Sequence, residues 1–274
     1  MIQKKRLIYN TFLLTGVSLL MSCIGIAFQV WLVGRIGSAG IGLYQLVLSV
    51  TGLAMTFAIS GIRFASTRLI SEELGALNCA GIRAAMRRCL GYALLFGLAA
   101  GLILWTLAEP IGFLWIGDAR TVRSLRLSAV SMPCAALCAA LSGYFTACGR
   151  VWKPSAVHLA EQLVGIALVA LCLARVPTED IELSCAAVTL GRVIADVVSL
   201  TLMLAVYTDD RRRHYGECGG GQRLTARMLK IALPLAVSAY ARSALTTLQN
   251  LLVPRGLKSA GYSADGALSG YGVI

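Results

Sequence analysis

Seven apolar segments, each long enough to cross a lipid bilayer, constrain this chain more than any other feature. A transmembrane helix needs about 20 predominantly apolar residues. The segments cover residues 7–33, 41–62, 90–107, 125–147, 155–173, 184–207 and 228–253. Backbone groups in lipid have no water to bond, and long runs without period-two alternation are helices rather than barrel strands. The sequence therefore predicts an all-α polytopic membrane protein.

The composition agrees with this class and narrows the partners. Hydrophobic residues make up 57% of the chain and charged residues 14%, with a mean hydropathy of +0.75, which excludes an ordinary soluble domain. The net charge of +12 would suit a nucleic-acid-binding protein. The cationic residues, however, lie in short loops between apolar segments, where topology determinants and contacts to anionic lipids are found. We expect anionic membrane lipids as partners and no nucleic acid.

The distribution of Lys and Arg predicts the orientation. With the N-terminus inside, the inner loops hold sixteen of the 25 Lys and Arg residues and the outer loops hold seven. This bias favours a cytoplasmic N-terminus in the cell membrane. The apolar run that follows the basic residues 4–6 is too long for a signal-peptide core, so we interpret it as a retained first span.

A basic stretch divides the chain into two unequal parts. Residues 207–230 contain the run DDRRRH and a Gly-Gly-Gly sequence, and we interpret them as a cytoplasmic linker. Residues 1–206 would then form a six-helix N-terminal lobe, and residues 231–274 would begin a second lobe. An offset of 220 aligns Gln29 with Gln249 and Arg35 with Arg255, which indicates a parallel repeat. An eighth span would start at residues 270–274, so we expect the chain to be a C-terminally truncated fragment.

Four ionisable residues fall inside apolar segments, where they cost about 2.5–3.5 kcal/mol each on insertion scales. They are Glu161, Arg192, Asp196 and Arg242. Arg192 and Asp196 are four residues apart on one helix face, so they either neutralise each other or face a polar cavity. In a cavity between the two halves, Arg192 and Arg242 would attract an anionic substrate group. Glu161 or Asp196 would couple transport to a proton or a sodium ion.

Two further arginines end the second segment on its inner side. Arg63 and Arg68 are either interfacial anchors or the rim of an inward-facing cavity that first meets a phosphate. The single His158-x-x-Glu161 pair has no second suitable histidine, so we expect no metal site. Without a hydrolytic motif we also expect no enzyme and no cofactor. The nine cysteines contain no C-x-x-C, and GxxxG at Gly97 and Gly101 is typical of helix packing.

Four motifs in order resemble a known transporter family. They are GRIGSAGIGLY at 34–44, GIRFASTRLISE at 61–72, GYFTA at 143–147 with KPSAVHLAEQ at 153–162, and IALP at 231–234 with LVPR at 252–255. The chain resembles the stage V sporulation protein B and polysaccharide-exporter group of the multidrug/oligosaccharidyl-lipid/polysaccharide (MOP) flippase superfamily. The resemblance covers the whole chain and places Arg63, Arg68, Glu161 and Arg255 at motif positions.

The resemblance implies two facing six-helix lobes and the flipping of lipid-linked saccharides across the cytoplasmic membrane. The implied substrates are undecaprenyl-pyrophosphate-borne peptidoglycan precursors or polysaccharide units, used in cell-wall synthesis and sporulation. Relatives often carry two arginines in the first span, and the corresponding stretches here read MSC at 21–23 and FQV at 28–30. Pyrophosphate binding is therefore absent or has moved to Arg63, Arg192 and Arg242.

Two other functions remain open from the residues. A cation-coupled multidrug antiporter of the same fold would use the acidic residues of the cavity. A non-transporting membrane scaffold would be an inactive relative.

Overall fold

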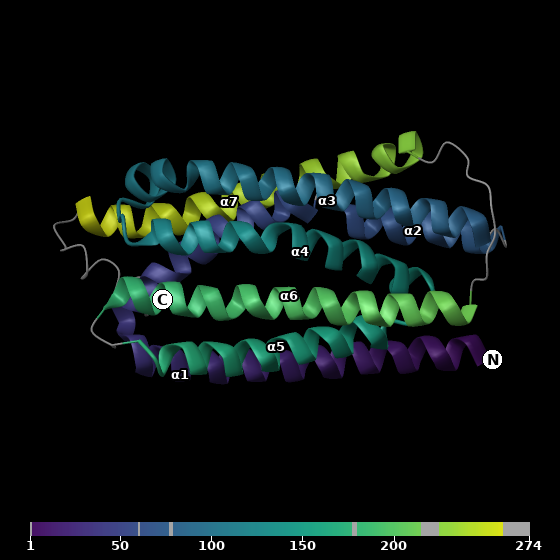
Figure 1. Ribbon diagram of the computed structural model, residues 1–274, viewed down its shortest axis with the longest axis horizontal. Helices are drawn as coiled ribbons and strands as arrows, with labels where there is room; N and C mark the ends of the chain where they lie inside the picture. The colour runs from purple at the N-terminus through teal and green to yellow at the C-terminus, as the bar shows by residue number, and fades with distance from the viewer. Residues whose placement is uncertain (1, 60, 77–78, 177–179, 215–224, 260–274) are drawn as a thin grey trace.

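The described part of the chain is helical apart from short turns, which confirms the all-α prediction. The computed structural model describes residues 2–59, 61–76, 79–176, 180–214 and 225–259. Its elements are α1 (Ile2–Ile59), α2 (Ile62–Gly75), α3 (Cys79–Pro110), the π-helix η1 (Ile111–Ile116), α4 (Thr121–Ala147), α5 (Trp152–Leu173), α6 (Ile181–His214) and α7 (Thr225–Ser259) (Figure 1). The expected eighth span lies outside the described residues.

Glycines with positive φ break the first long helical region twice. At Gly37 the backbone adopts φ 72° and ψ 171°, which L side chains rarely allow, so α1 consists of two sections, 2–36 and 38–59. Gly61, at φ 70°, separates α1 from α2. The second segment was expected to end at residue 62, but helix α2 continues beyond it. The reason is amphipathic packing, because α2 buries Ile62, Leu69 and Ile70 against its neighbours.

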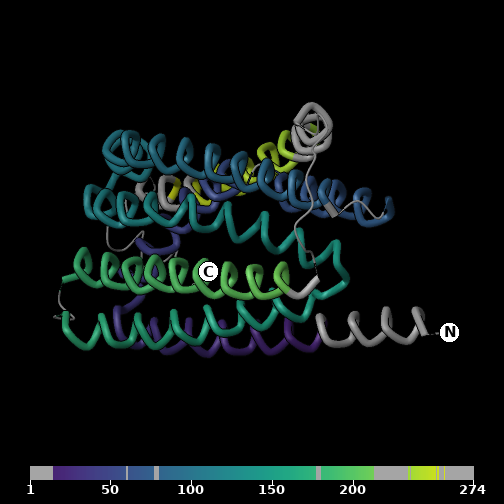
Figure 2. Tube along the Cα trace, turned by 45° about the vertical axis from the view of Figure 1, so that its right-hand side comes forward, coloured from purple at the N-terminus to yellow at the C-terminus, as the bar shows by residue number. Residues whose placement is uncertain are grey.

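The helices pack in layers. In both views α5 and the first section of α1 lie on one side, α3 lies on the opposite side, and α6 and α4 lie between them (Figures 1 and 2). The most extensive contacts join α3 to α4, α5 to α6 and α4 to α6. The second section of α1 contacts α4 and α7, so it lies on the far side of the bundle from the first section. This section separates the two cavities described below.

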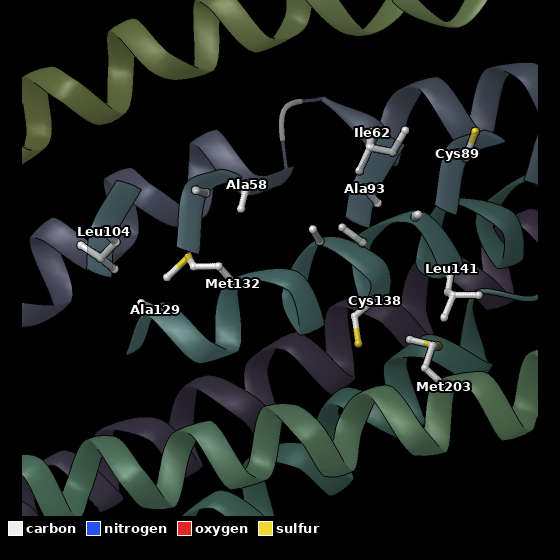
Figure 3. Packing of buried hydrophobic residues seen from close by; sticks show 14 of the residues in the cluster. Ala58, Ile62, Cys89, Ala93, Leu104, Ala129, Met132, Cys138, Leu141 and Met203 are labelled. Atoms are coloured by element: carbon white, nitrogen blue, oxygen red, sulfur yellow. The ribbon is translucent and has the colours of Figure 1, made fainter. Parts of the chain in front are cut away.

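Small residues allow the closest approaches. A Cβ added at Gly97 would lie 2.7 Å from Cα of Pro133, and one at Gly101 would lie 2.7 Å from the carbonyl oxygen of Ala129. The GxxxG pattern therefore packs α3 onto the α4 backbone, as expected. Around this contact Ala58, Ala93, Leu104 and Met132 form part of one buried cluster (Figure 3).

The outer faces of the bundle are apolar. Leu95, Leu102 and Leu114 expose 63%, 67% and 72% of their surfaces, which in water would be costly. Among the described residues, five helical segments are long and apolar enough to cross a membrane. One of these is the stretch Thr15–Gly75, which includes the turn at Gly37, most of the first expected span and all of the second. The chain is a multi-pass membrane protein.

Candidate transport sites

A cavity of about 360 Å³ lies between the second section of α1 and helices α4, α5 and α6. We call it the acidic cavity. Its ionisable lining residues other than Tyr44 and Cys138 are Arg63, His158, Glu161, Arg192 and Asp196. Its hydroxyl-bearing lining residues are Tyr44, Thr51, Ser128, Ser131, Thr189 and Ser199. Such a concentration of polar groups within membrane-spanning helices is typical of an ion or substrate pathway.

Glu161 is held by side chains from two helices. Ser199 Oγ, on α6, donates a hydrogen bond to Glu161 Oε2 at 2.6 Å. His158 Nδ1, one turn earlier on α5, lies 3.2 Å from the same oxygen. Glu161 Oε2 thus contacts both Ser199 and His158. The packing of α5 against α6 places Ser199 beside Glu161.

Arg192 and Asp196 line the same cavity from α6. The Asp196 carboxylate interacts with the Ser131 side chain of α4, and its charge is close to that of Arg192. Arg192 reaches toward α5, because a Cβ at Gly165 would lie 3.8 Å from its Nη1. Glu161 is also near the Arg192 charge. The positive charge of Arg192 therefore acts on both carboxylates and not on Asp196 alone.

A second and larger cavity of about 1110 Å³ lies between α7, α2 and the second section of α1. We call it the α7 groove. Two cationic side chains line it, Arg63 from α2 and Arg242 from α7. The remaining polar lining residues are Gln45, Ser49, Thr56, Ser238, Ser243, Thr246, Thr247 and Asn250.

Hydrogen bonds between α1 and α7 cross one side of this groove. Thr56 Oγ1 donates to Ser243 Oγ at 3.1 Å. Ser49 accepts at its carbonyl oxygen from Thr247 Oγ1 at 3.1 Å and at Oγ from Asn250 Nδ2 at 2.8 Å. The contact between α1 and α7 therefore includes side-chain hydrogen bonds, which are a common means of association between transmembrane helices.

The structure divides the predicted site residues into groups. Glu161, Asp196 and Arg192 lie together in the acidic cavity, whereas Arg242 lines the α7 groove. The sequence did not predict this separation. Arg63 lines both cavities.

The other two predicted residues lie elsewhere. Arg68 is exposed on α2 and pairs with Glu72 at 3.2 Å, outside the linings of both cavities. The side chain of Arg255 lies outside the described residues.

Sequence reasoning missed the hydroxyl groups that surround the acids. Ser199, Ser131 and Thr51 look like ordinary small residues of transmembrane helices, and their role follows only from which face of each helix meets the cavity. A weak signal was present for Ser199, since it follows Asp196 by three residues on the same helix face.

A buried ionic cluster at the end of the bundle where α4 is followed by α5 was also missed. Asp210 of α6 is fully buried and accepts hydrogen bonds from Tyr144 Oη at 3.0 Å and Lys153 Nζ at 2.6 Å. Arg150 also pairs with it.

The predicted linker, 207–230, is helical at both ends, in α6 up to His214 and in α7 from Thr225. Its central residues, 215–224, lie outside the described part.

Comparison with known proteins places this arrangement in a family. The MatE family profile matches residues 10–171, more than half of the chain. The chain is 23% identical to stage V sporulation protein B of Bacillus subtilis (strain 168) over 280 residues, covering 99% of this chain and 53% of that protein.

Two solved structures show the same fold. One is described as the inward-facing conformation of a multidrug resistance MATE family transporter of the MOP superfamily. It matches with a TM-score of 0.64 and 14% identity, over 92% of this chain and 56% of that one. A chain described as protein A matches with a TM-score of 0.66 and 15% identity, over 94% and 56%.

The chain spans about half the length of each of these relatives. The family is one of membrane transporters and not of enzymes. By its matched profile, which covers more than half of the chain, the chain belongs to the MatE family.

Proposed function

We propose that this chain forms part of a flippase that moves a lipid-linked, pyrophosphate-bearing saccharide across the cytoplasmic membrane by alternating access. The saccharide is a peptidoglycan precursor or a polysaccharide unit. The observation that carries the proposal is the α7 groove, which presents Arg63 and Arg242, while Glu161 and Asp196 line the acidic cavity beside it. The likeness to stage V sporulation protein B over nearly the whole chain supports the same assignment.

The groove has the chemistry that a pyrophosphate needs. Guanidinium groups form charge-assisted, often bidentate hydrogen bonds to phosphate oxygens. Arg242 is exposed on α7, and Arg63 is exposed just after the Gly61 break, so both are free to face a substrate in the groove. Apolar residues such as Leu48 and Phe64 line the same groove and suit the lipid part of the substrate. In the orientation that the basic loops favour, Arg63 lies toward the cytoplasm, where the substrate is loaded.

The acidic cavity supplies the coupling, and we assign the coupling ion as a proton. Arg192 lines this cavity beside Glu161 and Asp196, so a metal cation would meet a positive charge there. A carboxylate binds a proton covalently and needs no set of oxygen ligands around it. The described residues contain no group of three or more His, Cys, Asp or Glu side chains that could hold a metal ion.

Replacing Arg242 with Ala tests the substrate site. A charge-assisted hydrogen bond contributes about 1.5–3 kcal/mol, so we expect translocation of a fluorescent undecaprenyl-pyrophosphate disaccharide in proteoliposomes to fall by about tenfold or more. Arg63→Ala should act in the same direction. Arg87→Ala is the control, because Arg87 is exposed on α3 and lines neither cavity. Wild-type translocation in both Arg242→Ala and Arg63→Ala would refute the substrate site.

Replacing Glu161 with Gln and Asp196 with Asn tests the coupling site. In wild-type proteoliposomes we expect a pH gradient to accelerate translocation and a sodium gradient at constant pH to have no effect. Either variant should lose the response to the pH gradient, because a neutral amide exchanges no proton. A response to sodium alone, or a full pH response in both variants, would contradict the assignment.

A cation-coupled multidrug antiporter is the second candidate. The fold likeness to a multidrug resistance transporter and the presence of the acidic cavity favour it. An antiporter would export a cationic dye such as ethidium, with the export lost in Asp196→Asn and unaffected in Arg242→Ala. The flippase proposal predicts no dye export. It also predicts that Arg242→Ala lowers transport of the lipid-linked saccharide.

A further inference from the structure

Gly52 lies in the middle of the second section of α1, and close helix packing does not explain it. A Cβ added there would meet no atom of a neighbouring residue within 4 Å. At Gly97, Gly143 and Gly191, by contrast, a Cβ would lie 2.7, 1.9 and 2.8 Å from atoms of another helix. Glycine costs about 1 kcal/mol relative to alanine in a helix interior. The space beside Gly52 is therefore the feature to explain.

Gly52 lies where the two cavities adjoin. Four residues line both the acidic cavity and the α7 groove, namely Leu48, Gly52, Ile59 and Arg63. Their spacings of four, seven and four residues place Leu48, Gly52 and Ile59 on one stripe of the helix. The cavities thus meet along this stripe, and Gly52 is the point on it that carries no side chain.

An independent observation concerns the neighbouring residue. Thr51 is a lining residue of the acidic cavity, and its buried hydroxyl oxygen has no hydrogen-bond partner among the described residues. A buried hydroxyl left without a partner costs about 1–3 kcal/mol. This unpaired hydroxyl, next to Gly52, is a second local cost that helix packing does not explain.

We infer that the gap at Gly52 is the passage through which the coupling cation moves between the α7 groove and the acidic residues Glu161 and Asp196. The identity of the cation as a proton rests on the proposed function, but the passage itself follows from the two cavity linings. Substrate and cation then share one access route. A substrate seated in the groove covers the passage, so the acidic residues exchange their cation when the groove is empty.

Thiol labelling measures the passage directly and needs no transport assay. Ala135 lines the acidic cavity and Ala239 lines the α7 groove, so Ala135→Cys and Ala239→Cys serve as matched reporters. Each is placed in the purified chain with the native cysteines replaced, and the probe is 2-aminoethyl methanethiosulfonate. Gly52→Leu blocks the gap, and Gly52→Ala is the control, since a Cβ alone meets no neighbour there.

We expect Gly52→Leu to slow labelling at position 135 by about tenfold or more, the effect of about 1.4 kcal/mol in the barrier. Labelling at position 239 should be unchanged, and Gly52→Ala should label like the parent at both positions. Should Gly52→Leu fail to fold, Leu48→Trp narrows the same stripe and carries the same expectation.

Equal labelling at position 135 with and without the blocking side chain would overturn the passage and leave the transport proposal intact. Conversely, blocked labelling together with full pH-driven transport in Glu161→Gln and Asp196→Asn would retain the passage and refute the coupling site.

Discussion

At the scale of single residues, Asp210 shows that a charged residue expected in a solvated linker can be buried and stabilise the fold. In the sequence it lies in the run DDRRRH and was predicted to belong to a solvated linker. In the structure α6 continues through it, and its carboxylate accepts hydrogen bonds from Tyr144 and Lys153 and pairs with Arg150. The carboxylate therefore joins α4, the turn after it, and α5 to α6 at one end of the bundle.

Replacing Asp210 with Asn should destabilise the protein, because Arg150 and Lys153 would then face each other without a counter-charge. Removing one partner of a buried ionic group costs about 3 kcal/mol or more. We expect a clearly lower temperature of unfolding in detergent, measured by size-exclusion chromatography after heating. Asp209→Asn, at the exposed neighbouring position, is the control and should lower the unfolding temperature much less, because contacts of exposed charges contribute little to stability. Equal unfolding temperatures for the two variants would mean that the cluster does not stabilise the fold.

At the scale of elements, helix crossings decide which positions tolerate a side chain. The chain has two kinds of helical glycine on α3 alone. Gly97 and Gly101 meet the α4 backbone, while a Cβ at Gly91 would meet no neighbour within 4 Å. Sequence inspection recognises the GxxxG spacing but cannot identify the partner helix.

This difference yields a matched pair of predictions on one helix. Gly97→Ala and Gly101→Ala should each destabilise the α3–α4 contact, since overpacking costs about 1–3 kcal/mol. Gly91→Ala should leave the unfolding temperature unchanged or raise it, because alanine favours the helix more than glycine does. Thermal unfolding of the three variants in the same detergent checks this. A loss of stability in Gly91→Ala as large as in Gly97→Ala would contradict the packing argument.

The break at Gly61 is a second feature of the helices that hydropathy does not predict. The apolar run ends near residue 62, and hydropathy alone therefore placed the end of the second segment there. Helix α2 follows the break, and one of its faces is buried against α3 and α4. As a result Arg63 stands at the start of a helix beside both cavities, not at a simple membrane boundary.

At the scale of the whole molecule, the orientation in the membrane remains a prediction from charge. The inner loops carry more than twice as many Lys and Arg residues as the outer loops in this orientation. Alkaline phosphatase fused after Asp118 should be active, because the turn between η1 and α4 would face outward. Green fluorescent protein fused after Gly149, in the turn between α4 and α5, should fluoresce in the cytoplasm. The reverse pattern would invert the topology and the loading side of the α7 groove.

The division into two lobes also stays a prediction. The 220-residue offset aligns the ends of the first and seventh segments, and in the structure both segments are helical. Helix α7 contacts both α1 and α2, is hydrogen-bonded to α1 through side chains, and lines a groove with the two helices. This is the contact expected of a first helix from a second lobe, and it presents Arg242 to the groove.

The sequence by itself determined the fold class, the family and the approximate positions of the long apolar helices, but not the separate helix α2. These depend on segment length, apolar composition and short motifs, which are local properties of the chain. It also identified the costly ionisable residues inside the membrane, since composition alone exposes them. Only the tertiary structure decided that Arg192 joins Glu161 and Asp196 while Arg242 lines another cavity. That separation depends on the rotation and crossing of packed helices, and side chains far apart in the sequence determine both.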